Sequence, residues 1–154
     1  MRWLRHWAPA ILWAAAIWTF STGAFTSENT SRFLLPMLKW LLPGASAATL
    51  LLLHSLIRKA AHVAEYFVFS LLALRGVRGE ERGWRVTWGL AAIVIVLCYA
   101  ALDEVHQLLV PGRGASPWDV LLDGFGAVLA QAVAAWRVRR AELEITLADE
   151  TGKR

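Results

Sequence analysis

The stretch from residue 101 to residue 126 concentrates ionisable side chains between two apolar runs. Its members suited to proton transfer or ion binding are Asp103, Glu104, His106, Arg113, Asp119 and Asp123. Carboxyl and imidazole groups can act as general acids or bases, and an arginine can hold an anion. Ionisable groups at membrane depth are costly and are usually functional. We therefore interpret this stretch as the larger part of one polar site.

A second set of polar residues lies in the motif RKAAHVAEY, which spans residues 58–66. At ~100° per residue, Lys59, His62 and Tyr66 fall within one ~60° arc of a helix. Glu65 borders that arc. An imidazole exchanges protons near neutral pH, and a lysine can neutralise acids or hold a phosphate. We expect this helix face to complete the site.

Helical spacing also sorts the residues of the later stretch by face. Asp119 and Asp123 are stacked one turn apart. Asp103 shares a face with Gln107, whereas His106 falls on the other side of Asp103. We therefore expect His106 to point away from the site.

Residue type and spacing together suggest roles for these side chains. The candidate catalytic residues are His62, Asp103, Asp119, Glu104 and Asp123, with proton transfer assigned first to His62 and to Asp103 or Asp119. The candidate ligand-binding residues are Lys59, Glu65, Tyr66, Gln107, Arg113 and Ser116, with Arg113 holding an anion. Carboxyl groups crowded in a low dielectric favour retention of a proton by at least one of them, which would place an acid beside a base.

Composition indicates an integral membrane protein of the all-α class. The chain has 154 residues and 57% of them are apolar, whereas soluble proteins have about 45–50% apolar residues. A chain of this length can hold three or four spanning helices and no separate soluble domain. The net charge of +4 does not indicate a nucleic-acid partner, because the arginines flank apolar runs instead of forming a basic face interleaved with aromatics.

Four apolar segments are predicted to span the membrane as one helix bundle, at about residues 7–25, 56–75, 86–109 and 117–136. Another segment, within residues 31–43, is interrupted by Pro36 and Pro43 and is predicted to be an interfacial helix on the outer surface. The helix of the second span can start near residue 45. It would then exceed the ~30 Å hydrocarbon core, so its first part is expected to project outward or to bend near Ser55.

Lysine and arginine accumulate on one side of this arrangement, which predicts that the N-terminus and the C-terminus are both cytoplasmic. Residues 1–140 would form a single transmembrane domain, and residues 141–154 a polar cytoplasmic tail. The first apolar segment also has the shape of a secretory signal peptide, with a cleavage region at residues 21–24. Its tryptophans and the apolar runs that follow it favour an uncleaved first span.

Depth along the predicted helices is a second test of the single site. Counting ~1.5 Å per residue from the inner arginine of each helix, His62 lies ~20 Å, Asp123 ~21 Å and Asp103 ~27 Å from the inner end. Three spans therefore place their charged residues in one layer near the outer face of the membrane. Gln131 is the outlier, near the inner side.

Taken together, the motifs RKAAHVAEY, DEVHQLLVPGRGASPWD and VLLDGFG closely resemble the VanZ-like family. The matching residues are Lys59, His62, Tyr66, Asp103, Glu104, Gln107, Pro111, Arg113, Ser116, Asp119, Asp123 and Gly126. Two positions depart from the commonest pattern: Asp123 stands where asparagine is frequent, and Ala130 where a second glycine is frequent. Asp123 adds a negative charge, which could change what the site binds.

The resemblance implies a small multi-pass protein of the bacterial cytoplasmic (inner) membrane, within the cell envelope. The namesake of the family is associated with resistance to the glycopeptide antibiotic teicoplanin. The family pattern attaches no firm reaction to these residues, so whether the protein is an enzyme stays open.

Four interpretations of the polar residues remain open. The first is a site that binds or processes a lipid-linked or cell-wall-related head group at the outer leaflet. The second is structural: the polar groups only hold the helices together, at ~0.6 kcal/mol per bond. The third is a metal site drawn from His62, Glu65, Asp103, Glu104 and His106, although the chain lacks two histidines four residues apart.

The fourth interpretation is a transporter or channel, which the lack of a detectable internal repeat disfavours. The expected partners are the membrane lipid bilayer, a lipid-linked or cell-wall precursor ligand and, as an option, a second copy in a homo-oligomer. We expect no cofactor and no nucleic acid.

Overall fold

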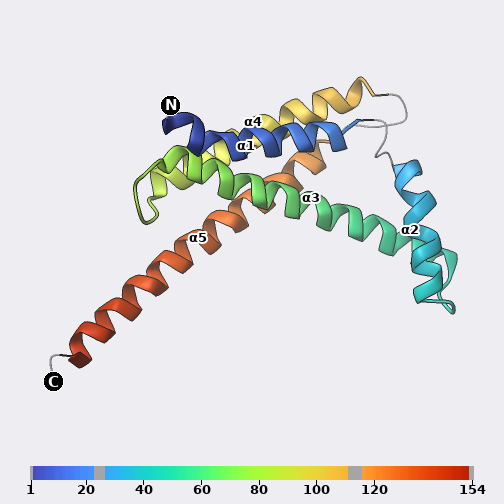
Figure 1. Cartoon of the computed structure of the whole chain (residues 1–154). Helices are drawn as coiled ribbons and strands as arrows, with labels where there is room; N and C mark the ends of the chain where they lie inside the picture. The colour runs from blue at the N-terminus through green and yellow to red at the C-terminus, as the bar shows by residue number, and fades with distance from the viewer. Residues whose placement is uncertain (1, 23–26, 111–115, 153–154) are drawn as a thin grey trace.

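The computed structural model describes residues 2–22, 27–110 and 116–152, and these residues form an all-helical fold, as predicted. Figure 1 shows the elements, which are α1 (Arg2–Phe20), α2 (Ser27–Leu41), α3 (Ala47–Arg78), α4 (Val86–Leu108) and α5 (Pro117–Gly152). No strand occurs in the part of the chain that is described.

Three of these helices, α3, α4 and α5, are long enough and apolar enough to cross a membrane. This finding supports a multi-pass membrane protein, but the predicted first span is not among the three. α1 has 19 residues and carries Arg2, Arg5 and His6 in its first turns. Its apolar part, residues 7–20, is therefore shorter than the ~20 apolar residues of a usual span.

The first two helices begin earlier than the sequence predicts. α1 runs from Arg2 to Phe20, whereas residues 7–25 are predicted, and residues 23–25 lie outside the described part of the chain. The predicted interfacial helix is α2, which begins at Ser27 and continues through Pro36. A single proline removes one backbone hydrogen bond and can kink a helix without ending it.

α3 is a single helix from Ala47 to Arg78 and continues through Ser55 without interruption. Its start is capped by Ser46, whose hydroxyl accepts a hydrogen bond from the Thr49 backbone N–H at 3.2 Å. Its end is followed by Gly79 at φ +63°, a left-handed conformation that glycine adopts at low cost. The first half of α3 projects away from the other long helices and lies beside α2 (Figure 1). The first half therefore extends beyond the bundle as part of the same helix.

α5 extends well past its predicted end at residue 136 and includes most of the predicted polar tail. The segment after Trp136 contains no glycine or proline before Gly152, so nothing in it breaks the helix. An exposed pair one turn apart, Arg140 Nε to Glu144 Oε1 at 2.9 Å, adds a small stabilisation. Figure 1 shows this second half of α5 leaving the bundle as a free arm.

The core lies where α3, α4 and α5 pack against one another, with α1 along α3. Its larger side chains include Tyr66, Phe69 and Val96. The fully buried small residues are Ala73, Ala92, Ala100, Ala127 and Ala130. Small residues let helix backbones approach closely in a membrane. Polar side chains of different helices can therefore reach one another near this core.

α1 is held to its neighbours by hydrogen bonds from ring donors. Trp13 Nε1 donates to the Glu65 backbone oxygen at 2.9 Å. Tyr99 Oη donates to the Ala14 backbone oxygen at 2.6 Å. These two bonds fix α1 against α3 and α4, and they bring Ser21, which follows the last residue of α1, to the end of α4.

A buried polar cluster ties α3 to α5 and accounts for the outlying Gln131. Gln131 Nε2 donates to Ser70 Oγ at 2.9 Å and to the Ser70 backbone oxygen at 3.1 Å. Ser70 Oγ donates in turn to the Ala127 backbone oxygen at 3.1 Å. Trp84 Nε1 donates to Gln131 Oε1 at 3.1 Å. Every polar side-chain atom of Ser70 and Gln131 is thus paired, as expected of a structural contact.

α3 and α5 approach each other closely at Gly126. A Cβ atom added at this glycine would lie 2.5 Å from the Val63 backbone oxygen and 3.3 Å from the Phe67 backbone nitrogen. Backbone atoms cannot move aside as the end of a flexible side chain can, so only glycine fits here.

We predict that Gly126→Ala destabilises the protein by separating α3 from α5. Overpacking of this kind costs about 1–3 kcal/mol, so the midpoint of thermal unfolding in detergent should fall by several degrees. Gly44→Ala is the matched control, because a Cβ there meets nothing within 4 Å. Equal unfolding midpoints for the two variants would contradict the close crossing.

Candidate functional site

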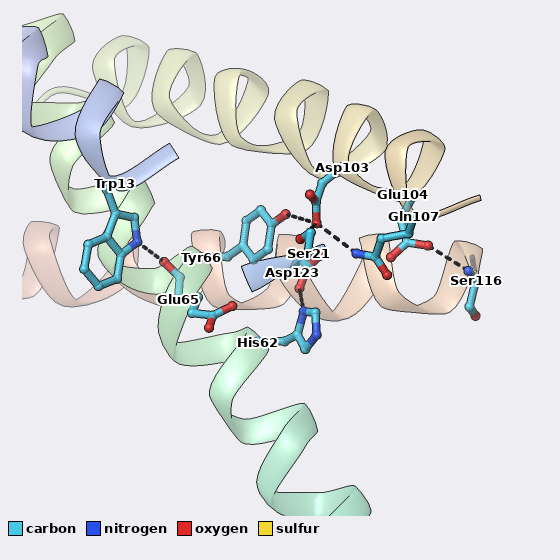
Figure 2. Close-up of polar contacts among 10 residues, drawn as sticks. All are labelled: Trp13, Ser21, His62, Glu65, Tyr66, Asp103, Glu104, Gln107, Ser116 and Asp123. Atoms are coloured by element: carbon cyan, nitrogen blue, oxygen red, sulfur yellow. Dashed lines mark hydrogen bonds and ion pairs between the residues drawn. The ribbon is translucent and has the colours of Figure 1, made fainter. Parts of the chain in front are cut away.

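The centre of the site is Asp103, which lies near the end of α4 and is 2% exposed. One of its oxygens, Oδ2, accepts hydrogen bonds from Ser21 Oγ at 2.7 Å and Gln107 Nε2 at 2.9 Å, and the Tyr66 hydroxyl approaches it at 3.5 Å. Figure 2 shows these donors converging on the carboxyl group from α3, from α4 itself and from the residue after α1. The other oxygen, Oδ1, is buried and has no hydrogen-bond partner among the described residues.

Beside this carboxyl group, His62 of α3 faces Asp123 of α5. The His62 Nδ1 and Asp123 Oδ1 atoms are 3.4 Å apart, and the two side chains are 25% and 2% exposed. The contact is close enough for an ion pair but is not aligned as a hydrogen bond, so both atoms are unsatisfied within the described structure. A small movement or a proton on His62 would complete the pair.

Two buried carboxyl groups, those of Asp103 and Asp123, are thus close to one partly exposed imidazole (Figure 2). Burying a carboxylate without a partner is costly. Several hydrogen-bond donors surround one oxygen of Asp103, whereas Asp123 depends on His62 to balance its charge. This arrangement can store a proton between a carboxyl group and an imidazole, and it can pass that proton to a group that reaches His62.

Glu104 has a different position from the other acids. Its Oε2 accepts a hydrogen bond from the Ser116 backbone N–H at 2.8 Å, and the Ser116 hydroxyl accepts one from the Trp118 N–H at 3.3 Å. Both contacts satisfy backbone donors at the start of α5, where a negative charge also complements the helix dipole. Glu104 and Ser116 therefore join the end of α4 to the start of α5.

A cavity of about 260 Å³ lies on the side of His62 toward α1 and α2. Its lining residues are Phe20, Ser21, Thr30, Arg58, Ala61, His62 and Glu65. Arg58 is half-buried there, and its guanidinium donates to Thr30 Oγ1 of α2 at 2.9 Å. The Glu65 carboxyl group and the His62 ring project from α3 on the same side (Figure 2).

The structure gathers most of the site residues predicted from the sequence but not all of them. Those at the cluster or its cavity are His62, Glu65, Tyr66, Asp103, Gln107 and Asp123, with Glu104 and Ser116 beside them. Asp119 is half-buried, one turn before Asp123. Lys59 is exposed and does not line the cavity, and Arg113 lies outside the described residues. His106 is turned toward α1 and stacks on Trp18, with ring centroids 3.9 Å apart.

Three polar residues of the site and its cavity were missed by sequence reasoning, namely Ser21, Thr30 and Arg58. Arg58 precedes His62 by four residues, so helical spacing alone places both on one face of α3. Ser21 carries no such signal. It follows the end of α1, and its contact with Asp103 joins residues 82 positions apart.

Fold and site together define a small helical membrane protein with a buried cluster of carboxyl groups and one histidine between its long helices. The family model described as VanZ/LLP1 matches residues 6–138. The chain therefore belongs to the VanZ/LLP1 family, which confirms the resemblance that the motifs indicated. No protein of curated function and no solved structure matches the chain.

We predict that Glu104→Ala lowers stability, whereas Glu104→Gln keeps most of it, because the glutamine carbonyl can still accept from the Ser116 N–H. Loss of a helix cap costs about 0.5–2 kcal/mol. Thermal unfolding in detergent measures the difference, and Glu142→Ala, at an exposed position of α5, serves as the control. A stability of Glu104→Ala equal to that of the control would contradict a capping role.

Proposed function

We propose that this protein binds or processes the head group of a lipid-linked or cell-wall-related molecule at the outer leaflet of the bacterial cytoplasmic membrane. In this proposal α1 is a fourth, shorter crossing, both termini are cytoplasmic, and the site lies at the outer ends of α4 and α5. The observation that carries the proposal is the close approach of His62 to buried Asp123 beside a cavity.

The contrast between the two polar clusters supports a functional role for the outer one. In the Ser70–Gln131 cluster each polar side-chain atom has a partner. In the outer cluster, Asp103 Oδ1 and Asp123 Oδ1 are buried without a hydrogen bond in the described structure. Buried unsatisfied polar groups are rare and often mark functional sites. A cluster that served only to hold helices together would be expected to resemble the first.

The geometry suggests how the roles are divided. Asp103 has three donors around one oxygen, so it is better suited to fixing Ser21 and Tyr66 than to moving a proton. His62 is the partly exposed member of its pair and can exchange a proton with a ligand, while Asp123 orients and balances the imidazole. Asp119, one turn nearer the start of α5, is a further acid candidate.

The family supplies the biological setting of the proposal. We propose that the protein contributes to resistance against glycopeptides of the teicoplanin type, through the molecule that its site recognises. The alternative is a non-catalytic structural or interaction protein whose buried polar residues only hold the bundle together. The two proposals differ in whether a substitution in the site can remove activity without lowering the amount of folded protein.

We predict that His62→Ala and Asp123→Ala abolish most of the protein's effect on teicoplanin susceptibility while leaving its amount in the membrane near wild type. The measurement is the minimal inhibitory concentration for bacteria that express each variant, paired with quantification of the protein in membranes. His6→Ala, at the opposite end of the molecule, is the control.

A loss of resistance that only follows a loss of protein would favour the structural alternative. Full function of both variants would overturn the proposed site. If expression of the wild-type protein does not change teicoplanin susceptibility, the proposed contribution to resistance is wrong.

A further inference from the structure

The cavity beside His62 contains a cation that is not among the site residues predicted from the sequence. Arg58 is half-buried, lines the cavity and lies one turn before His62 on α3. Thr30 takes one of its five N–H donors at 2.9 Å, which leaves the planar fork able to meet an anionic oxygen group. Lys59, the motif residue beside it in sequence, is exposed and outside the cavity.

An acid stands at the other end of the same cavity. Glu65 also lines it and lies seven positions after Arg58 on α3, or ~10 Å along the helix axis. His62 lies between them. The cavity therefore offers a positive group at one end and a negative group at the other.

The charge balance around the cavity restricts the ligand. Among the described residues, the acids that line the cavity or contact its lining are Glu65, Asp103 and Asp123, against the cations Arg58 and His62. This excess of acids would repel a ligand that carried only negative charge. A ligand that carried only positive charge would meet Arg58 inside the cavity. A ligand with one charge of each sign can pair with both ends.

The size and surroundings of the cavity indicate which part of a molecule enters it. A volume of about 260 Å³ is below the ~300–1,000 Å³ of pockets that enclose a whole drug-sized ligand. It suits a compact head group. Next to it, the first half of α3 exposes Leu51, Leu52, Leu56 and Ile57, an apolar surface along which hydrocarbon chains can lie.

We propose that this cavity binds the zwitterionic head group of an amphiphile, with a phosphate or carboxylate on Arg58 and an ammonium group on Glu65. The inference rests on the proposed function, that this site takes a head group, and it assigns the chemical class of that head group. It places the reactive part of the ligand next to His62, because the anion and the ammonium occupy the two sides of the imidazole.

The test measures binding to the purified full chain in dodecyl maltoside by native mass spectrometry. Three dihexanoyl lipids serve as probes: phosphatidylethanolamine with both charges, phosphatidylglycerol with the anion alone, and a trimethylammonium-propane lipid with the cation alone. We expect the first to bind at least about tenfold tighter than the other two. Equal binding of the three lipids would overturn the proposal.

Variants separate the two ends of the cavity. Arg58→Gln should weaken phosphatidylethanolamine binding by at least about tenfold, because it removes a charge-assisted contact. Glu65→Gln should abolish the preference for phosphatidylethanolamine over phosphatidylglycerol. Lys39→Gln, which removes an exposed positive charge from α2, is the control for net charge. Loss of binding in Lys59→Gln but not in Arg58→Gln would make the motif lysine the anchor and overturn the assignment.

Arg58 also ties α3 to α2, so loss of binding in Arg58→Gln needs a companion variant. Thr30→Val breaks the same bond between α2 and α3 but keeps the guanidinium charge. We expect Thr30→Val to retain the preference for the zwitterionic lipid. If it loses binding as fully as Arg58→Gln, Arg58 acts by holding α2 and the proposal fails.

Glycerophosphoethanolamine, the same head without chains, identifies the source of the ligand. If this compound binds more weakly than the lipid, the ligand is an amphiphile, and equal binding overturns that part of the proposal.

Failure of the zwitterion proposal can be told apart from failure of the proposed function. A missing zwitterion preference leaves the susceptibility result for His62 and Asp123 standing, whereas full resistance in those variants with an intact preference overturns the proposed function alone.

Discussion

Burial of carboxyl groups between long helices is the constraint on which the rest of this structure depends. Asp103 and Asp123 are each 2% exposed, and a buried carboxylate without donors or a counter-charge would strongly destabilise the fold. Gln107 of α4 itself supplies one donor to Asp103, and further partners come from other segments of the chain. Ser21, after the end of α1, and Tyr66, on α3, face Asp103, and His62 faces Asp123. The positions of α1, α3 and α5 relative to α4 follow from these contacts.

Close helix packing makes those contacts possible. The backbones of α3 and α5 nearly touch at Gly126, and fully buried alanines continue the close approach in the core. A bulkier residue at this crossing would move Asp123 away from His62, which lies one residue before Val63. Packing and polar chemistry are thus linked: the same crossing that excludes a Cβ brings a histidine to within 3.4 Å of a carboxyl group.

The two buried polar clusters are built on opposite principles. The Ser70–Gln131 cluster is complete, so it adds stability and direction to the packing of α3 on α5. The cluster around Asp103 keeps buried oxygens without partners and adjoins a cavity that Arg58 and Glu65 also line. α2 closes one side of that cavity through Thr30. The bond from Arg58 to Thr30 gives a reason for α2 to pack on the projecting half of α3.

Composition and periodicity were sufficient to predict an all-helical membrane protein and a polar layer shared by three helices, and the resemblance of the motifs indicated the family. These properties follow from local rules, since the helical repeat sets the face and the depth of each residue. The tertiary structure decided which faces meet. It placed Arg58 in the cavity and left Lys59 exposed, added Ser21 from a distant segment, and turned His106 toward Trp18. A one-residue step turns a side chain by ~100°, and only the crossing of the helices determines whether that direction leads into the site or into lipid.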